Sequence, residues 1–159
     1  MIASVLTISD RVSRGEAEDR SGDVLEELLR ADGYEVVRRV VPDERDEIAV
    51  VLEALAAGSN LVLTTGGTGL APRDVTPEAT LAVLDRAAPG IAEALRADSI
   101  AKTPHGLLSR GVAGTVGAAL VVNLPGSAGG CRDGYAVLRP ALSHALSLLA
   151  DEATAHRQT

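Results

Sequence analysis

Blocks of apolar residues separated by polar segments run through the first half of the chain. Three short runs rich in Val, Ile and Leu are typical of strands buried on both faces, and they span 2–9, 34–41 and 60–65. Between these runs, apolar residues recur at helical spacing in 21–33 and 43–58, and a glycine stands at the end of each segment. This β-α-β-α-β order predicts a mostly parallel sheet with helices on both faces.

The second half of the chain is less regular. The pattern predicts two helices that each open with a proline, one more buried strand and a helical tail kinked or restarted at Pro140, in the segments 76–87, 89–101, 118–124 and 135–153. The segment 106–117 indicates no definite element. The polar segment 10–22 is expected to be a loop, with Ser21 capping the helix that follows.

Length and composition fit one domain with an aliphatic core. A chain of 159 residues has single-domain size, and a domain of this size buries roughly 70% of its unfolded surface. Aromatic residues make up only 1% of the chain, so Ala, Val and Leu have to fill the core. We therefore expect a single α/β domain over residues 1–159.

The charge balance excludes some functions and favours others. A net charge of −7 disfavours nucleic-acid binding, which requires a basic face. Of the 15 basic residues only Lys102 is a lysine, which leaves 14 arginines. Arginine binds anions through two parallel hydrogen bonds, although the same bias can also reflect genome composition.

The chain carries no sign of secretion or of a membrane segment. Its single cysteine, Cys131, excludes an internal disulfide and any multi-cysteine metal site, and fits a reducing compartment. The first ten residues contain no basic leader, and no apolar run approaches about 18 residues. We expect a cytoplasmic protein that does not contact membranes.

Two glycine-rich turns follow predicted strands. They have the sequences Thr-Gly-Gly-Thr-Gly at 65–69 and Asn-Leu-Pro-Gly-Ser at 123–127. Ligands of open α/β sheets bind at the carboxyl ends of the strands, and glycine lets backbone N–H groups converge on an anion there. Neither turn matches a P-loop or a dinucleotide fingerprint. Each alone could be a simple tight turn, but both are expected to face one crevice.

Two aspartates stand close to these turns in the sequence. Asp74 follows the first turn and Arg73, and Asp43 follows the second predicted strand. A carboxylate beside a phosphate site is repulsive unless a divalent cation bridges the two. This pattern predicts a site for Mg²⁺ and a nucleotide, and the alternative is that both acids only cap helices.

Other candidate groups carry weaker signals. The histidines at 105, 144 and 156 show no metal-ligand spacing, and no Ser-His-Asp signature is present. Cys131 has no histidine adjacent in sequence and is interpreted as a packing residue.

Taken together, these motifs resemble the MogA/MoaB family of molybdenum cofactor biosynthesis, the molybdopterin adenylyltransferases. The resemblance spans nearly the whole chain and rests on "TISDR" (7–11), "DRSG" (19–22), "VVPDE" (40–44), "TTGGTGLAPRDVTPEAT" (64–80), "PGIAEALR" (89–96), "LLSRGVAG" (107–114) and "VVNLPGSAGG" (121–130). It implies a three-layer α/β/α fold with a mostly parallel sheet. It also implies a Mg²⁺-dependent reaction in which the terminal phosphate of molybdopterin attacks the α-phosphorus of ATP, giving adenylyl-molybdopterin and pyrophosphate.

The resemblance also implies a role for individual residues. Asp43 and Asp74 match the essential acids and would act in catalysis and in binding Mg²⁺. The nucleotide and its phosphates would be bound by Ser9, Asp10, Gly66, Gly67, Thr68, Gly69 and Ser109. Molybdopterin would be bound by Glu93, Arg96, Arg110, Asn123, Pro125, Gly126 and Ser127. The family often has proline where this chain has Ala128, so the second turn is expected to be looser.

Several expectations remain open at this point. The alternatives are a MoaB-type paralogue that binds molybdopterin without catalysis, and a nucleotide hydrolase like the related domain of CinA proteins. The resemblance implies a homo-oligomer, usually a trimer and sometimes a hexamer, and a molybdate-insertion enzyme is a possible partner. The only aromatic residues, Tyr34 and Tyr135, lie away from the first turn, so adenine is expected to be held by backbone and aliphatic groups.

Overall fold

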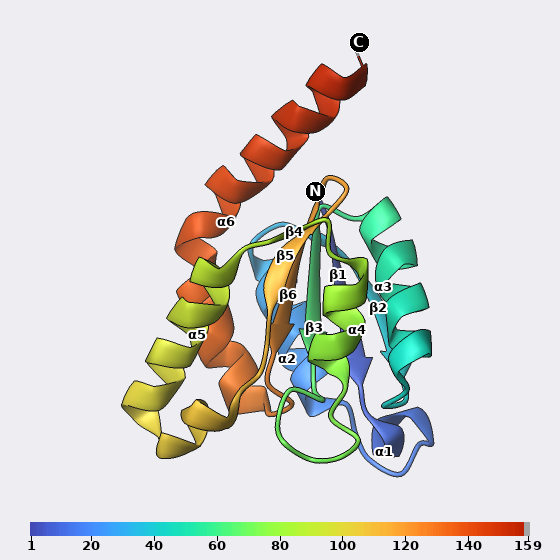
Figure 1. The fold of residues 1–159 in the computed structure, drawn as a ribbon, viewed down its shortest axis with the longest axis vertical. Helices are drawn as coiled ribbons and strands as arrows, with labels where there is room; N and C mark the ends of the chain where they lie inside the picture. Colours follow the sequence, from blue (N-terminus) through green and yellow to red (C-terminus); the bar gives the residue numbers. More distant parts are fainter. Residues whose placement is uncertain (158–159) are drawn as a thin grey trace.

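The computed structural model describes residues 1–157, with the side chains of residues 1–150. One six-stranded sheet has the order β2-β1-β3-β6-β5-β4 (Figure 1). The strands are β1 (Ile2–Ile8), β2 (Glu35–Val41), β3 (Leu61–Thr65), β4 (Arg86–Ala87), β5 (Ala113–Val116) and β6 (Ala119–Leu124). The first four strands in this order run parallel, whereas β5 and β4 add antiparallel pairs. The prediction of a mostly parallel sheet is confirmed.

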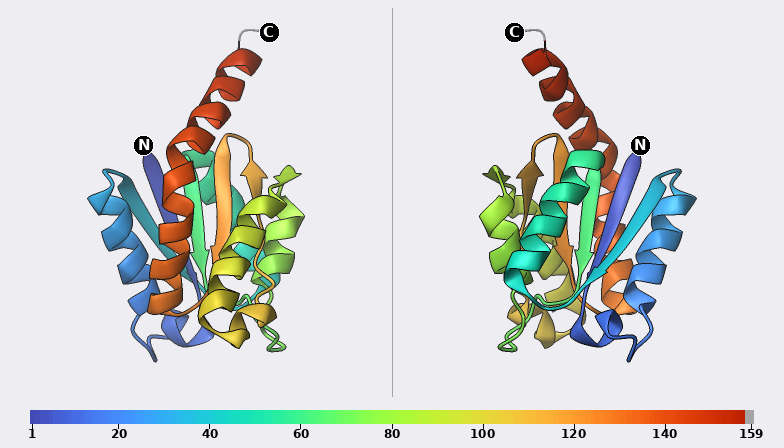
Figure 2. Two further views of the ribbon diagram at one scale, coloured as in Figure 1. Left: turned by 90° about the vertical axis from the view of Figure 1, so that its left-hand side faces the viewer. Right: turned by 90° about the vertical axis from the view of Figure 1, so that its right-hand side faces the viewer.

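Helices cover both faces of this sheet. They are α1 (Asp10–Ser13), α2 (Arg20–Ala31), α3 (Arg45–Gly58), α4 (Thr76–Val83), α5 (Pro89–Lys102) and α6 (Ala128–Arg157), with a 3₁₀ turn at Pro104–Leu108. Figure 2 shows α2, α5 and α6 on one face and α3 and α4 on the other. The three-layer α/β/α fold is therefore confirmed.

Each face of the sheet has its own aliphatic core. On the α2–α5–α6 side, Leu25 and Leu29 of α2 pack with Leu138 and Leu142 of α6. On the other side, Ile48 and Leu52 of α3 pack with residues of β1, β3 and β6. The aromatic side chain buried among them is that of Tyr135, so aliphatic residues supply the packing, as composition predicts.

The segment after β1 differs from the expected loop. Residues 10–13 form the short helix α1, and α2 begins at Arg20 with Asp19, not Ser21, as its cap. Asp19 Oδ1 accepts the N–H of Gly22 at 3.0 Å, and its Oδ2 accepts the Thr7 hydroxyl at 2.7 Å. The Thr7 contact joins the start of α2 to β1. Local sequence patterns do not reveal a contact between residues 12 positions apart.

The second half departs from prediction at two places. The helix predicted at 76–87 ends at Val83, because Asp85 N–H donates to the Thr115 carbonyl and β4 pairs with β5. The helix α6 begins at Ala128 and continues through Pro140 without restarting, although it bends along its length (Figure 2). No helix within residues 1–157 is long and apolar enough to span a membrane.

The side chain of Asn123 connects three parts of the domain. It is 4% exposed, and its amide donates to the hydroxyls of Thr64 and Thr80, each at 3.0 Å. Its Oδ1 accepts the N–H of Val112 at 3.1 Å. These bonds fasten the end of β6 to β3, α4 and the loop before β5, so the side chain of Asn123 has a positioning role.

Replacing Asn123 with alanine is expected to lower the free energy of unfolding by about 2–3 kcal/mol, because buried partners lose their hydrogen bonds. The matched control is Asn60→Ala at the opposite edge of the sheet, which removes one bond to the N–H of Ile2 (3.0 Å). That control is expected to lose about 1 kcal/mol. Urea denaturation measures both values, and equal losses would contradict the connecting role of Asn123.

Candidate active site

Most of the predicted site residues gather at one edge of the sheet. The strands β1, β2, β3 and β6 run parallel, so the segments after them meet at their carboxyl ends. The strand β5 runs the other way, and the loop before it reaches the same edge. This edge collects Ser9, Asp10, Asp43, Gly66, Gly67, Thr68, Gly69, Ser109, Pro125, Gly126 and Ser127.

The first glycine-rich turn, residues 65–69, requires glycine at two positions. Gly66 and Gly67 have φ angles of 101° and 66°, which other residues rarely adopt. A Cβ on Gly66 would also collide with the carbonyl oxygen of Ile8. Thr76 holds the turn in place, since its hydroxyl donates to the Gly66 carbonyl at 2.9 Å and its N–H to the Gly67 carbonyl at 3.1 Å.

The backbone of this turn is suited to an anion. Within residues 1–157, the N–H groups of Gly67, Thr68 and Gly69 donate to no protein acceptor. Successive backbone N–H groups in a turn can bind an anion together. Thr76, which the sequence offers as a cap for the helix that Pro77 opens, does not cap α4; its buried hydroxyl supports the turn instead.

The second glycine-rich turn, residues 123–127, packs directly on the first. A Cβ on Gly126 would lie 3.2 Å from the Cα of Gly66, and the Thr65 hydroxyl donates to the Pro125 carbonyl at 2.8 Å. Cys131 lies below this contact with its sulfur 3.3 Å from Thr65 Oγ1. Burial raises the pKa of the Cys131 thiol to about 11, so it stays protonated and acts in packing, as predicted.

Two cavities of about 480 Å³ each lie on either side of the second turn. The first is walled by α5, the 3₁₀ turn and the start of α6, and includes Arg96, Ser109 and Pro125. The second is walled by the end of β1 and the start of α2, and includes Ser9 and Gly66. Ser127 lines both cavities, so two ligands bound in them would meet at this residue.

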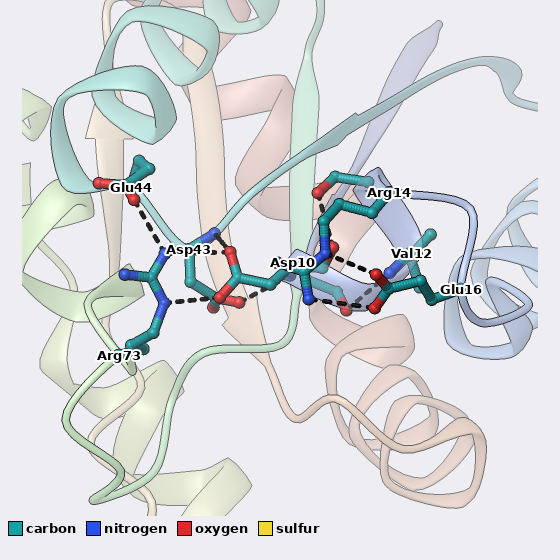
Figure 3. Close-up of polar contacts among 9 residues, drawn as sticks. Asp10, Val12, Arg14, Glu16, Asp43, Glu44 and Arg73 are labelled. Atoms are coloured by element: carbon teal, nitrogen blue, oxygen red, sulfur yellow. Dashed lines mark hydrogen bonds and ion pairs between the residues drawn. The ribbon is translucent and has the colours of Figure 1, made fainter.

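A cluster of carboxylates lies beside the first turn (Figure 3). Asp10 and Asp43 bond reciprocally: the Asp10 N–H donates to Asp43 Oδ2 at 2.9 Å, and the Asp43 N–H to Asp10 Oδ1 at 3.1 Å. Arg73 makes two hydrogen bonds to the Asp10 carboxylate, and these hold its pKa below the ordinary value. Burial raises the pKa of Asp43, and the charges of Asp10 and Asp74 raise it further.

Neither Asp43 nor Asp74 caps the helix that follows it in sequence. The helices α3 and α4 begin after Glu44 and Val75, and neither has a side-chain hydrogen bond at its cap. The prediction that the two acids cap α3 and α4 is therefore wrong, although Asp43 accepts the N–H of Asp10, the first residue of α1. Asp74 instead accepts the Ala71 N–H at 3.0 Å.

Both acids lie against glycine backbone. A Cβ on Gly67 would lie 3.2 Å from Asp43 Oδ1, and a Cβ on Gly69 would lie 2.9 Å from Asp74 Oδ2. Among the residues that the structure describes, no three His, Cys, Asp or Glu side chains are grouped to hold a metal. A pair of carboxylates is instead the protein's usual share of a Mg²⁺ site that phosphates and waters complete.

Three residues expected to contact molybdopterin are placed differently. Arg110 lies behind the first turn, where its Nε donates to the Gly69 carbonyl at 2.7 Å and its Nη2 to the Asp74 carbonyl at 2.6 Å, and it also pairs with Glu78. It braces the turn and lines neither cavity. Glu93 is exposed on α5 outside both cavities. Asn123 lines the first cavity, but its amide makes the internal hydrogen bonds described above.

The residues predicted to bind the nucleotide are divided between the cavities: Ser9 and Gly66 line the second, whereas Thr68, Gly69 and Ser109 line the first. Neither Asp43 nor Asp74 lines either cavity. Arg96 lines the first cavity and donates to the Gly111 carbonyl at 2.7 Å. Neither Tyr34 nor Tyr135 lines either of these two cavities, and the Tyr135 hydroxyl donates to Asp32 at 2.8 Å. His105 lines the first cavity, and the side chain of His156 lies outside the described residues.

Comparison with known proteins places this site in a family context. Residues 4–144 match the family model described as "Probable molybdopterin binding domain". The chain is 39% identical to the molybdopterin adenylyltransferase of Helicobacter pylori, over 91% of this chain and 85% of that protein. It is 48% identical to the crystal structure of MoaB from Thermus thermophilus, with a TM-score of 0.87 over 94% of this chain and 96% of that one.

Some relatives are much longer than this chain. The molybdenum cofactor synthesis protein cinnamon of Drosophila melanogaster is 38% identical over 98% of this chain, which spans 26% of that protein. The chain spans less than half the length of the first curated relatives that it matches.

The raised pKa of Asp43 leads to a testable prediction about the stability of the protein. A carboxyl with a raised pKa in the fold takes up protons on folding, so stability falls as pH rises from its ordinary value of 3.8 through the raised one. Asp43→Asn removes the ionised group and is expected to be more stable than the natural protein at pH 7. This gain should shrink as the pH is lowered toward 3.8.

Thermal unfolding between pH 3.5 and 8 measures this difference. The control is Asp46→Asn, whose side chain is 95% exposed on α3 and should show no such pH-dependent gain. Two results would show that the fold does not disfavour the ionised form of Asp43. One is an Asp43→Asn protein no more stable than the natural one at pH 7, and the other is a gain in stability that is equal at all pH values.

Proposed function

The chain belongs to the family of molybdopterin-binding domains, and from this premise we propose that it is a molybdopterin adenylyltransferase of molybdenum cofactor biosynthesis. In the proposed reaction the terminal phosphate of molybdopterin attacks the α-phosphorus of ATP. The new P–O–P bond gives adenylyl-molybdopterin, and pyrophosphate leaves. Relatives named for this activity support the proposal, and so does the geometry of the two cavities.

The observation that carries the proposal is the meeting of two cavities at Ser127. A transferase that joins two ligands has to hold both at once with the reacting atoms close together. A binding protein for one ligand has no need of a second cavity of equal size against the same residue. Gly66 and Gly126, which pack against each other, line the cavity beside β1 next to Ser127.

The nucleotide is assigned to the first turn and the cavity beside β1. Ser9 and Gly66 line this cavity. The N–H groups of residues 67–69, of which Thr68 and Gly69 line the cavity beside α5, would bind phosphate oxygens that reach past Gly66. No aromatic ring is available to stack on adenine, because Tyr34 and Tyr135 lie elsewhere. Backbone and aliphatic groups near 66–72 would hold the base, and most of the affinity for ATP would come from its phosphates.

Molybdopterin is assigned to the cavity beside α5. Arg96 lines this cavity and is fixed by its bond to the Gly111 carbonyl, so its charge would attract an anionic ligand. Ser109, Pro125 and Ser127 complete the wall nearest the first turn. The terminal phosphate would then lie at Ser127, directed at the nucleotide.

Asp43 and Asp74 would hold Mg²⁺ together with phosphate oxygens. The residues fit this role, because both carboxylates lie against glycine backbone and Asp43 faces two further negative charges. When bound, the cation would neutralise phosphate charge and favour departure of pyrophosphate. The protein's own contribution is to hold the carboxylates and the turn rigid, which Arg110 and Thr76 do through the backbone.

We also propose that the chain forms a homo-oligomer, with a trimer as the expected state. Apolar side chains are exposed close together on the α5 side, where Ile100 is 41%, Leu107 67% and Leu108 49% exposed. Burying such side chains between subunits is favourable. Their position supports assembly without specifying its symmetry.

Asp43→Asn and Asp74→Asn are each expected to lower the rate of adenylylation at least a hundredfold, because an electrostatic group that acts on the transition state is worth several kcal/mol. The control Asp46→Asn, on the exposed face of α3, should keep its activity. The assay follows adenylyl-molybdopterin in single-turnover reactions with ATP and Mg²⁺, and chelation of Mg²⁺ should stop it.

Two results would overturn the proposed function. One is an Asp74→Asn protein that is folded and turns over at the natural rate. The other is a natural protein that binds molybdopterin but forms no adenylyl-molybdopterin, which is the behaviour of a carrier.

Light scattering at micromolar concentration tests the assembly. The expected mass is about three times the 16.3 kDa of one chain. Leu107→Lys should shift the population toward smaller species if the α5 side forms the interface. A single 16.3 kDa species for the natural protein would contradict the proposed oligomer.

A further inference from the structure

Arg73 occupies an unusual position beside the carboxylate cluster (Figure 3). It belongs to the loop after the first glycine-rich turn and reaches two other segments of the chain. Its Nε and Nη2 donate to the Asp10 carboxylate at 2.6 and 3.0 Å, and Nη2 also donates to Glu44 Oε1 at 2.8 Å. The turn is thereby tied to α1 and to the residue before α3.

These contacts are well formed but open to solvent. The Arg73 side chain is 56% exposed and that of Glu44 59%, whereas Asp10 is 20% exposed. Ion pairs at this level of exposure hold their partners weakly, since water and salt screen them. The guanidinium can therefore leave Asp10 without breaking a buried bond.

The charges around Arg73 explain why a cation is needed there. Asp43 faces the carboxylates of Asp10 and Asp74, and both raise its pKa, whereas Arg73 opposes them. Arg14 is also close to Asp10, but its guanidinium is paired with Glu16. Without Arg73, the group would hold adjacent negative charges with no hydrogen-bonded arginine among them.

We propose that Arg73 is an exchangeable counter-ion, which binds Asp10 in the ligand-free protein and transfers to a phosphate oxygen when MgATP binds. This inference rests on the proposed function for the identity of the ligand. Arginine binds phosphate as readily as carboxylate, through the same pair of N–H groups. A divalent cation held by Asp43 and Asp74 would supply the positive charge that the guanidinium gives up.

The exchange gives Arg73 opposite effects on two ligands. It competes with a free cation for the carboxylates, but it assists a nucleotide by contacting a phosphate. A residue that only braced the loop would weaken both ligands when removed. The two binding constants therefore separate exchange from a structural role.

The first experiment compares Arg73→Gln with Arg14→Gln, a neighbouring arginine whose guanidinium is paired with Glu16 instead of the Asp10 carboxylate. Mn²⁺ alone, followed by electron paramagnetic resonance, should bind Arg73→Gln more tightly than the natural protein. ATP with Mg²⁺, followed by calorimetry, should bind it about tenfold more weakly, the value of one charged hydrogen bond. Arg14→Gln should change neither constant by as much.

The second experiment observes the arginine directly in the natural protein. The Nε–H signal of Arg73 in nuclear magnetic resonance, assigned through Arg73→Lys, should move when MgATP is added, as its partner changes from carboxylate to phosphate. The signal of Arg14 should stay in place. Any one of three results would overturn the exchange. These are weaker Mn²⁺ binding in Arg73→Gln, unchanged affinity of Arg73→Gln for MgATP, and an Arg73 signal that does not move when MgATP is added.

These results are separable from those for the proposed function, because neither experiment contains molybdopterin. A protein that shows the exchange but never forms adenylyl-molybdopterin would remove the proposed reaction and leave this inference standing. A protein that adenylylates molybdopterin with an unmoved Arg73 signal would remove the inference alone.

Discussion

The backbone of Gly66 packs against the carbonyl of Ile8, at a distance that no side chain permits. Gly126 in turn packs against the Cα of Gly66, so the ends of β1, β3 and β6 meet backbone to backbone. The rest of the site depends on this contact. It brings together the two turns that line the cavities on either side of Ser127.

The same arrangement brings several carboxylates close together, although repulsion between them lowers the stability of the fold. Asp43 is partly buried beside Asp10 and Asp74, and both burial and these neighbours raise its pKa. Groups held against their preferred charge state are typical of functional sites, where a ligand supplies the missing partner. Arg73 provides partial compensation from the surface, and the braces from Arg110 and Thr76 keep the loop from relaxing away.

Much of the fold could be predicted from the sequence. The parallel strands and their helices follow from apolar periodicity, and the glycine-rich turns at strand ends locate the site. The strand β4 could not be predicted, because Arg86–Ala87 become a strand only by pairing with β5. The cap of α2 was assigned to Ser21 for a similar reason, since Asp19 is fixed by Thr7 on β1.

The site residues show the same division. Most residues of the quoted motifs lie together at the carboxyl edge of the sheet, because these motifs follow the ends of strands in the sequence. The direction of a side chain depends on contacts over long stretches of sequence, as with Arg110, which turns back onto the 69–74 loop. The pairing of Arg73 with Asp10 joins residues 63 positions apart and has no local signal.

The central claim is that two ligands bind at once and meet at Ser127. A structure of the protein with molybdopterin, Mg²⁺ and a non-hydrolysable ATP analogue tests it most directly. The account predicts the pterin in the cavity beside α5, the nucleotide phosphates on residues 67–69, and the terminal phosphate of molybdopterin facing the α-phosphorus beside Ser127. Ligands that exclude each other, or whose phosphates lie on opposite sides of the sheet edge, would contradict it.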